Sequence, residues 1–340
     1  MQAVKSPLRT RFLPEAEYAR WSGMVRDSPE GSIYSLPEYL EILCAATGGR
    51  FRILSIERND EILGGIALYE EARRLGLWVA PRLLLFYNGP VLARCESRYP
   101  SLCTARDLEV AAALIVALDG IGVPRLSLRC RSPFADARPF LRAGWIAYPN
   151  YTYVVSLADL EATWGRIEQN LRRLVRRCEE GGVQFTEDGD FESYYRMHED
   201  IHRRKGASLY LPERHFRDYV ERLRDGGLGR LFHARLANGR SVAAQLVLTG
   251  GHPVTHTVAA ASDSEFLSLG ASAFLRWRVF DELHRAGYQG NDLTGAALGP
   301  VTHFKGQLGG DLKLYLNLKR PDRGVIRLLG PAMKLRFRHS

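Results

Sequence analysis

Residues 53–67 read ILSIERNDEILGGIA, and residues 231–245 read LFHARLANGRSVAAQ. Each stretch places two runs of strand-forming residues on either side of an Asn-Asp or Asn-Gly pair, which is typical of a tight hairpin turn. The sequence therefore predicts a β-hairpin at each of the two places.

The segments that follow the two hairpins come in the same order. Each hairpin is followed by an apolar helix, a break containing glycine and a short strand, at 108–118, 120–122 and 125–129 in the first half and at 271–285, 287 and 291–295 in the second. We interpret this repeated order as an internal duplication of one α/β unit. The alternative is coincidence, because hairpins followed by helices are common in α/β proteins.

The chain of 340 residues is long enough for two domains. Its 46% hydrophobic and 25% charged residues are typical of a globular protein and exclude a disordered or fibrous chain. We therefore predict an α/β fold with mixed sheets, in tandem domains at 1–150 and 151–320, followed by a basic tail at 321–340. We expect the second domain to carry the functional site.

The net charge of +9 favours phosphate-bearing or anionic partners. We expect no DNA partner. The N-terminal segment lacks the apolar run of a signal peptide, and no apolar stretch is long enough to span a membrane, so we expect a cytoplasmic protein. The five cysteines are an odd number without a CxxC pair, which predicts neither a disulfide framework nor a zinc knuckle.

Residues 198–202 read HEDIH and match the HExxH pattern of zinc proteases. In those proteins the two imidazoles share one helical face and hold the metal. Here Asp200 lies inside the motif, and the basic run Arg203-Arg204-Lys205 that follows would repel a divalent cation. We therefore predict no metal site.

Two basic helices are expected between the copies, at 159–180 and 191–205. Their arginines and lysine could hold the phosphates of a polyanionic substrate, and the candidates are Arg173, Arg177, Arg204 and Lys205. The alternative is a solvated basic face. Gly270, in the turn that precedes the helix at 271–285, is a further phosphate-binding candidate, because such a turn exposes backbone N–H groups.

The sharpest local pattern runs from residue 291 to residue 317. It reads NDLTG, a loop, then VTHFKGQLGGDLKLYLN, which combines a strand, a helical turn bearing Lys305 and a Gly-Gly turn into a closing strand. Together with Trp21 and SPEGSIY at 28–34, NLRRLVRRCEEG at 170–181 and YRMH at 195–198, this order resembles the Fem-type transferases, whose chains contain paired GNAT-like domains. The resemblance covers nearly the whole chain.

This resemblance implies transfer of an acyl or aminoacyl group onto an amine. Aminoacyl-tRNA is the favoured donor and acyl-CoA the alternative, with no tightly bound cofactor. The acceptor would be a cell-wall precursor or a small molecule. A non-catalytic basic adaptor at the inner face of the membrane, in peripheral contact through the tail, is a third hypothesis.

Aminolysis of an activated ester or thioester develops an oxyanion that a catalyst must stabilise. We expect Lys305, beside Phe304, to supply that charge, the alternative being a surface lysine that caps its helix. Asp292 and His303 are the candidates for accepting the proton of the amine. Asp292 could instead satisfy backbone N–H groups in its loop.

Overall fold

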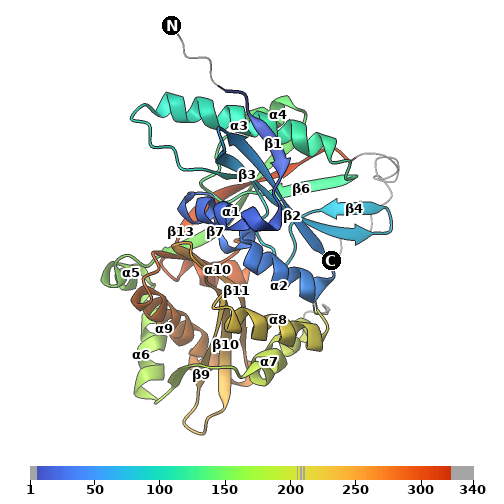
Figure 1. The fold of residues 1–340 in the computed structure, drawn as a ribbon. Coiled ribbons are helices and arrows are strands. Elements are labelled where there is room, and N and C mark those ends of the chain that lie inside the picture. The colour runs from blue at the N-terminus through green and yellow to red at the C-terminus, as the bar shows by residue number, and fades with distance from the viewer. Residues whose placement is uncertain (1–5, 205, 207–208, 210, 323–340) are drawn as a thin grey trace. The chain divides into compact units, whose positions relative to one another are not determined.

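The computed structural model describes residues 6–204, 206, 209 and 211–322 (Figure 1). It divides into two compact units, one formed by the chain up to Asn150 together with the segment that begins at Tyr315, the other by Tyr151–Leu314. Residues 315–319 are grouped with the first unit because they pair with a strand of its sheet. From residue 323 onward, the expected basic tail lies outside the described residues.

Each unit contains one mixed sheet. In spatial order, the first sheet consists of β1 (Arg9–Phe12), β2 (Arg50–Arg58), β3 (Glu61–Arg73), β4 (Gly76–Val79), β6 (Arg125–Arg129) and β13 (Asp311–Lys319), with β5 (Val91–Leu92) on β3. The second consists of β8 (Gln184–Glu187), β9 (Gly229–Arg235), β10 (Ser241–Leu248), β11 (Val254–Ser262), β12 (Gly290–Asp292) and β7 (Ile146–Ser156).

The first five strands of both sheets follow the chain in the same order, whereas the sixth comes after them in the first sheet (β13) and before them in the second (β7). In each, the first four strands are antiparallel neighbours, the fourth and fifth are parallel, and the sixth is antiparallel to the fifth. The duplication predicted from the repeated hairpins is therefore present in the strand topology.

Both predicted hairpins are confirmed. In the first, Asn59 and Asp60 have positive φ values of 50° and 62°, as a type I′ turn requires. In the second, Gly239 has φ 83° in the turn between β9 and β10.

The helices of the first unit are α1 (Tyr18–Asp27), α2 (Pro37–Thr47), α3 (Pro100–Gly120) and α4 (Arg138–Arg142). Those of the second are α5 (Leu160–Arg166), α6 (Gln169–Glu180), α7 (Phe191–Arg204), α8 (Glu213–Asp225), α9 (Ala271–Arg285) and α10 (Pro300–Gly306). Within the described ranges, no helix is both long and apolar enough to cross a bilayer.

The prediction of a single helix at 159–180 is wrong, because α5 and α6 are separate helices. Ile167 between them is extended, with ψ 133°, and the N–H of Glu168 donates to the carbonyl of Gln307. Gly309 lies so close to this break that a Cβ there would come within 3.1 Å of the Arg166 backbone. Packing against the turn before β13 therefore interrupts the helix.

The cysteines also depart from the expectation, because Cys95 and Cys103 form a disulfide. Cys103 lies in the first turns of α3, and the preceding loop folds back to bring the two Cα atoms to 5.6 Å. An odd number of cysteines excludes complete pairing but not a single local bridge.

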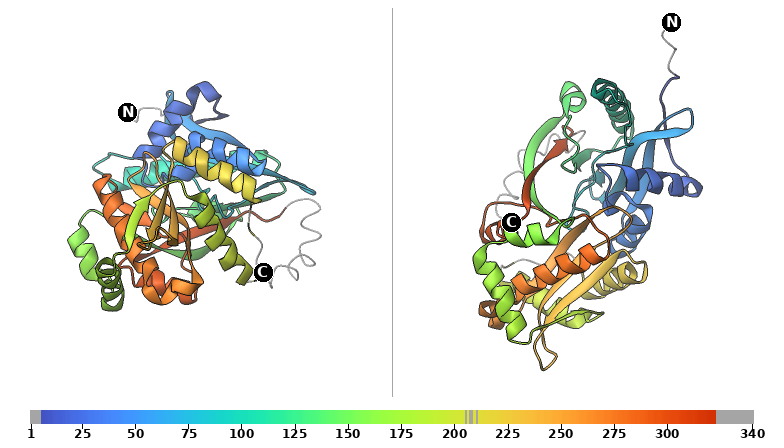
Figure 2. Two further views of the ribbon diagram at one scale, coloured as in Figure 1. Left: turned by 90° about the horizontal axis from the view of Figure 1, so that it is seen from below. Right: turned by 90° about the vertical axis from the view of Figure 1, so that its left-hand side faces the viewer.

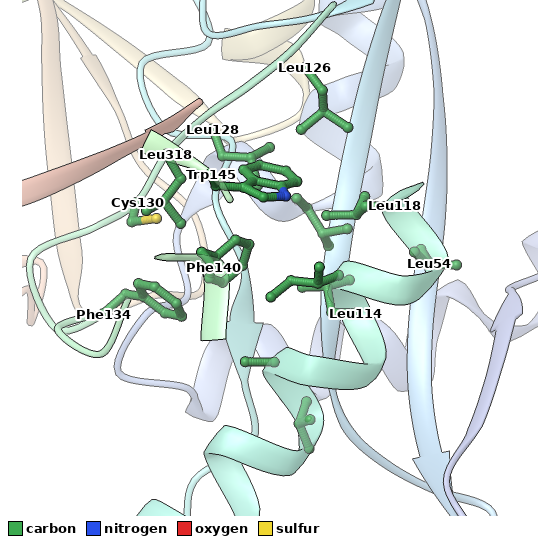
Figure 3. Close-up of a cluster of buried hydrophobic side chains, with 14 of the residues drawn as sticks. Leu54, Leu114, Leu118, Leu126, Leu128, Cys130, Phe134, Phe140, Trp145 and Leu318 are labelled. Atoms are coloured by element: carbon green, nitrogen blue, oxygen red, sulfur yellow. The ribbon is translucent and has the colours of Figure 1, made fainter. Parts of the chain in front are cut away.

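Each unit has its own apolar core. In the first, α3 packs on the sheet through Leu114 and Leu118, and the ring of Trp145 meets that of Phe140 edge-on at 5.1 Å (Figure 3). In the second, α6 and α9 cover one face of the sheet, with α9 along the β9–β10 hairpin (Figure 2). The helices α7 and α8 pack on the same strands through other side chains, including Phe191 and Phe216.

We expect Leu114→Ala to lower the free energy of unfolding of the first unit by about 2–5 kcal/mol, since it leaves a cavity in this core. Val116→Ala on the same helix is the control, because the Val116 side chain is 75% exposed. Chemical denaturation followed by circular dichroism measures both. Equal effects of the two substitutions would contradict the packing described.

Candidate functional site

Two of the predicted site residues line a cavity of about 330 Å³ in the second unit. Its walls come from α7, β10, β11, α9 and α10, and Arg204 and Phe304 line it. A larger depression of about 900 Å³ lies in the first unit, lined by charged residues such as Arg20, Asp60 and Arg106. The larger one contains none of the predicted site residues.

Lys305 lies on α10, and its side chain points back to the turn that follows β12. Its Nζ donates to the carbonyls of Thr294 and Gly295, both at 2.8 Å. This turn is left-handed, with φ 49° at Thr294 and 82° at Gly295, and it presents both carbonyls to the ammonium. Lys305 is thus half-buried and bonds to a neighbouring turn rather than to the carbonyls of its own helix.

The surroundings of Lys305 lower its pKa to about 8. Burial is the main cause, and the positive charge of Arg276 acts in the same direction, whereas Asp292 raises the pKa. The group is therefore mostly protonated at neutral pH. An ammonium has three N–H bonds, and two carbonyls take two of them, so the third remains available to an oxyanion.

Asp292 ends β12 and is 2% exposed. Its Oδ1 accepts hydrogen bonds from Thr152 Oγ1 at 2.6 Å and from the Thr294 N–H at 2.8 Å. Its Oδ2 lies 3.8 Å from Nδ1 of His256, a fully buried residue of β11. The carboxylate therefore fixes the turn that holds Lys305 and also faces an imidazole.

His303 is not part of this cluster. It lies two residues before Lys305 on α10, which directs it to the other side of the helix, and its side chain is exposed. It does not line the cavity.

The basic candidates have different surroundings. Arg177 donates through Nη2 to the carbonyls of Ser268 and Leu269 and so ties α6 to the turn before α9. Arg204 lines the cavity, with Nε 3.0 Å from an Asp200 carboxylate oxygen. Arg173 is exposed on α6. Lys205 lies outside the described residues.

Gly270 is the N-cap of α9 and has φ 87°. A Cβ at this position would lie 2.8 Å from Cβ of Leu174, so both the backbone conformation and the packing of α6 favour glycine. Its N–H donates to the carbonyl of Leu267. This glycine therefore has a structural role, whether or not the turn binds phosphate.

Arg276 and Gln245 also line the cavity, and neither was predicted from the sequence. Arg276 lies on α9 with Leu275 and Val279 beside it in the buried part of the helix. The sequence signal that could have identified Arg276 is an arginine on the apolar face of the predicted helix. For Gln245, which follows two alanines in a strand, the sequence contained no comparable signal.

The rings of the two HExxH histidines lie against each other on α7 and do not surround an empty space for a metal ion. The ring of His198 is 6% exposed and lies 4.4 Å from that of His202, whose Nδ1 is 2.9 Å from the His198 carbonyl oxygen. Among the residues the structure describes, no third acidic, histidine or cysteine ligand joins them. The one such group found, Asp188, Asp190 and His233, already has Arg235 paired with both carboxylates.

A family model described as an acetyltransferase (GNAT) domain matches residues 165–306, within the second unit. No curated protein matches the sequence. Among solved structures, FemX is similar with a TM-score of 0.69 and 12% identity, over 91% of this chain and 96% of that one.

Two other solved structures have a related architecture. One is the C-terminal domain of an Agrobacterium fabrum protein named as a lysylphosphatidylglycerol synthetase, with a TM-score of 0.59, 13% identity and coverage of 95% and 97%. The other is a tandem GNAT protein from the clavulanic acid biosynthesis pathway, with a TM-score of 0.53, 12% identity and coverage of 92% and 98%. The expected resemblance to Fem-type proteins is thus confirmed at the level of the fold: the chain has two GNAT-like units and a GNAT-like acyltransferase fold.

Proposed function

We propose that this protein forms an amide bond between an activated acyl group and an amine, with aminoacyl-tRNA as the favoured donor. The observation that carries this proposal is the half-buried ammonium of Lys305, which two carbonyls hold and whose third N–H bonds to none of the described residues. A fixed, partly desolvated donor is what the oxyanion of acyl transfer requires. The acyltransferase fold of the surrounding unit supports the same chemistry.

The reaction would proceed by attack of the acceptor amine on the donor carbonyl carbon. The new C–N bond forms as the carbonyl oxygen becomes an oxyanion, to which Lys305 donates its remaining N–H. The C–O bond to the tRNA ribose, or the C–S bond to CoA, then breaks. The proton lost by the amine passes to Asp292 and then to the departing oxygen or sulfur, so that the tRNA leaves as its alcohol or CoA as its thiol. We prefer Asp292 to His303 as the base because its carboxylate acts on the charge of Lys305.

For the donor, we propose a binding surface at the turn before α9. Arg177 holds the carbonyls of this turn, and Arg173 lies one helical turn earlier on α6. The guanidinium groups and the N-terminus of α9 all favour phosphate. GNAT enzymes that use acyl-CoA bind its phosphates at a turn with the pattern Q/R-x-x-G-x-G/A, of which this chain has only Gly270, with Leu267 and Ser272 at the first and last positions. We therefore favour aminoacyl-tRNA over acyl-CoA. The acceptor would be a small molecule or a cell-wall precursor.

The assignment of Lys305 predicts the outcome of a single-turnover assay of amide formation. We expect Lys305→Ala to lower the rate about 10²- to 10³-fold with little change in substrate binding, the usual result of losing one oxyanion donor. Lys313→Ala is the matched control, because Lys313 is exposed and pairs with Asp311. A wild-type rate in a folded Lys305→Ala protein would refute the role of Lys305.

The lowered pKa of Lys305 predicts a pH dependence. Only the protonated amine can donate to the oxyanion, so the single-turnover rate should fall as the pH rises through about 8. Lys305→Arg should retain part of the rate and move this fall to higher pH, because the guanidinium stays charged. The same alkaline fall in both proteins would assign the titration to another group.

The donor surface predicts a salt effect in filter binding of charged tRNA. We expect Arg177→Ala to weaken binding and to reduce the slope of log K against log salt by about 0.7–0.9, the loss of one phosphate contact. Arg214→Ala on α8 removes an exposed charge elsewhere and should leave the slope unchanged. Binding of CoA with no binding of charged tRNA would favour the alternative donor.

A further inference from the structure

The 330 Å³ cavity of the second unit has mostly apolar walls that contain two unsatisfied polar groups. Small and branched side chains such as Ala243, Ala260 and Leu275 form much of the surface. Arg276 and Gln245 line the same cavity, and each has a buried polar atom without a hydrogen-bond partner. Buried polar groups are normally paired, so these two atoms need an explanation.

Arg276 is 8% exposed, and its Nη1 has no hydrogen-bond partner. Burial lowers the pKa of the guanidinium to about 10, so it remains charged at neutral pH. Every Asp and Glu of the chain lies in the described part, and none of them forms an ion pair with Arg276. The protein therefore has no carboxylate side chain of its own for this charge.

An isolated buried charge opposes folding, because desolvation is not offset by a counter-ion. A neutral residue such as leucine would fill the same position on α9 at lower cost. The retained arginine is explained if an anion enters the cavity from outside. A planar guanidinium is suited to a carboxylate in particular.

Gln245 is fully buried, and a chain of hydrogen bonds fixes the orientation of its amide. This series of hydrogen bonds ends at the carbonyl of Gly290. A carbonyl can only accept, so Thr255 Oγ1 must donate to it. Thr255 Oγ1 then accepts from Nδ2 of Asn291, which turns Oδ1 of Asn291 towards the hydroxyl of Thr257.

The orientation of Asn291 determines which hydrogen bonds Thr257 and Gln245 can form. Thr257 Oγ1 donates to Asn291 Oδ1, so it accepts from Nε2 of Gln245. A reversed amide would put the Gln245 oxygen against an oxygen that has no proton to give. Oε1 of Gln245 is therefore left as an acceptor without a donor, in a residue that lines the cavity.

We propose that the cavity binds an α-amido carboxylate, the group found in an N-acylated amino acid or at the C-terminus of a peptide. The carboxylate would pair with Arg276, the neighbouring amide N–H would donate to Oε1 of Gln245, and the amino-acid side chain would contact the apolar walls. This inference rests on the proposed function, because it names the class of substrate that the transferase unit recognises.

Binding of three small probes to the purified wild-type protein, measured by calorimetry, tests the proposal. N-acetyl-L-leucine contains both groups, its primary amide lacks the charge, and 2-acetoxy-4-methylpentanoate keeps the charge but lacks the N–H. We expect the amide to bind about 10- to 100-fold more weakly, and the ester analogue about 3- to 10-fold more weakly. No binding of N-acetyl-L-leucine, or equal affinity for all three, would overturn the proposal.

Variants assign the two contacts. Arg276→Met should remove the difference between the acid and its amide, and Gln245→Leu should remove the difference between the acid and the ester analogue. Arg278→Met is the matched control, because Arg278 lies on the same helix but faces Glu179 at 3.9 Å. If Arg276→Met retains the preference for the acid, the assignment is wrong. The wild-type probe series stays decisive even if a variant does not fold.

The carboxylate site and the catalytic role of Lys305 can be tested separately. Lys305→Ala should still discriminate between the three probes, because the proposed contacts with Arg276 and Gln245 do not involve Lys305. A protein that needs Lys305 for turnover but does not discriminate between the probes would refute only the carboxylate site. Discrimination between the probes in a protein whose turnover does not need Lys305 would refute only the role of Lys305.

Discussion

The contact between Lys305 and the turn after β12 is the constraint on which the candidate site depends. Two backbone carbonyls hold the ammonium, and they can do so only because Thr294 and Gly295 are both left-handed. A positive φ is unfavourable for threonine. Asp292 compensates by accepting the N–H of Thr294, and the hydroxyl of Thr294 donates to the carbonyl of Thr257. The strained turn, the carboxylate and the lysine therefore form one interdependent group.

The same turn is connected to the cavity through buried polar side chains. Thr257 bonds to Gln245 on β10 and to Asn291 on β12, so the orientation of an amide in the cavity depends on residues two strands away. Such buried networks fix the orientation of their side chains, and Oε1 of Gln245 is an atom of this one without a hydrogen-bond partner. The unsatisfied member, Gln245, lies at the cavity, where a ligand can complete the network.

The sequence predicted the fold better than the site. Hairpins and amphipathic helices follow local patterns, so the two hairpins, the helix at 271–285 and the order of elements could be recognised. The break between α5 and α6 could not, because it depends on Gly309, more than a hundred residues away. Lys305 and Asp292 stood in a recognisable motif. Gln245 did not, because only the pairing of β10 with β11 gives its amide a direction.

The two units differ in the partners of their buried charged side chains. In the first unit the buried charges are paired: Glu57 binds Arg11, Glu70 binds Arg50 and Arg52, and Arg131 donates to the carbonyl of Pro29. The strand β6, which corresponds in order to β12, ends on Arg129 rather than on a carboxylate. In the second unit, Arg276 and Gln245 line one cavity, and each has a buried polar atom without a hydrogen-bond partner. Lys305, whose pKa is lowered, lies on α10, which forms part of the wall of this cavity. Two units of one topology share the same folding constraints, so the buried guanidinium of Arg276 beside a cavity of the second unit supports the anion site proposed there.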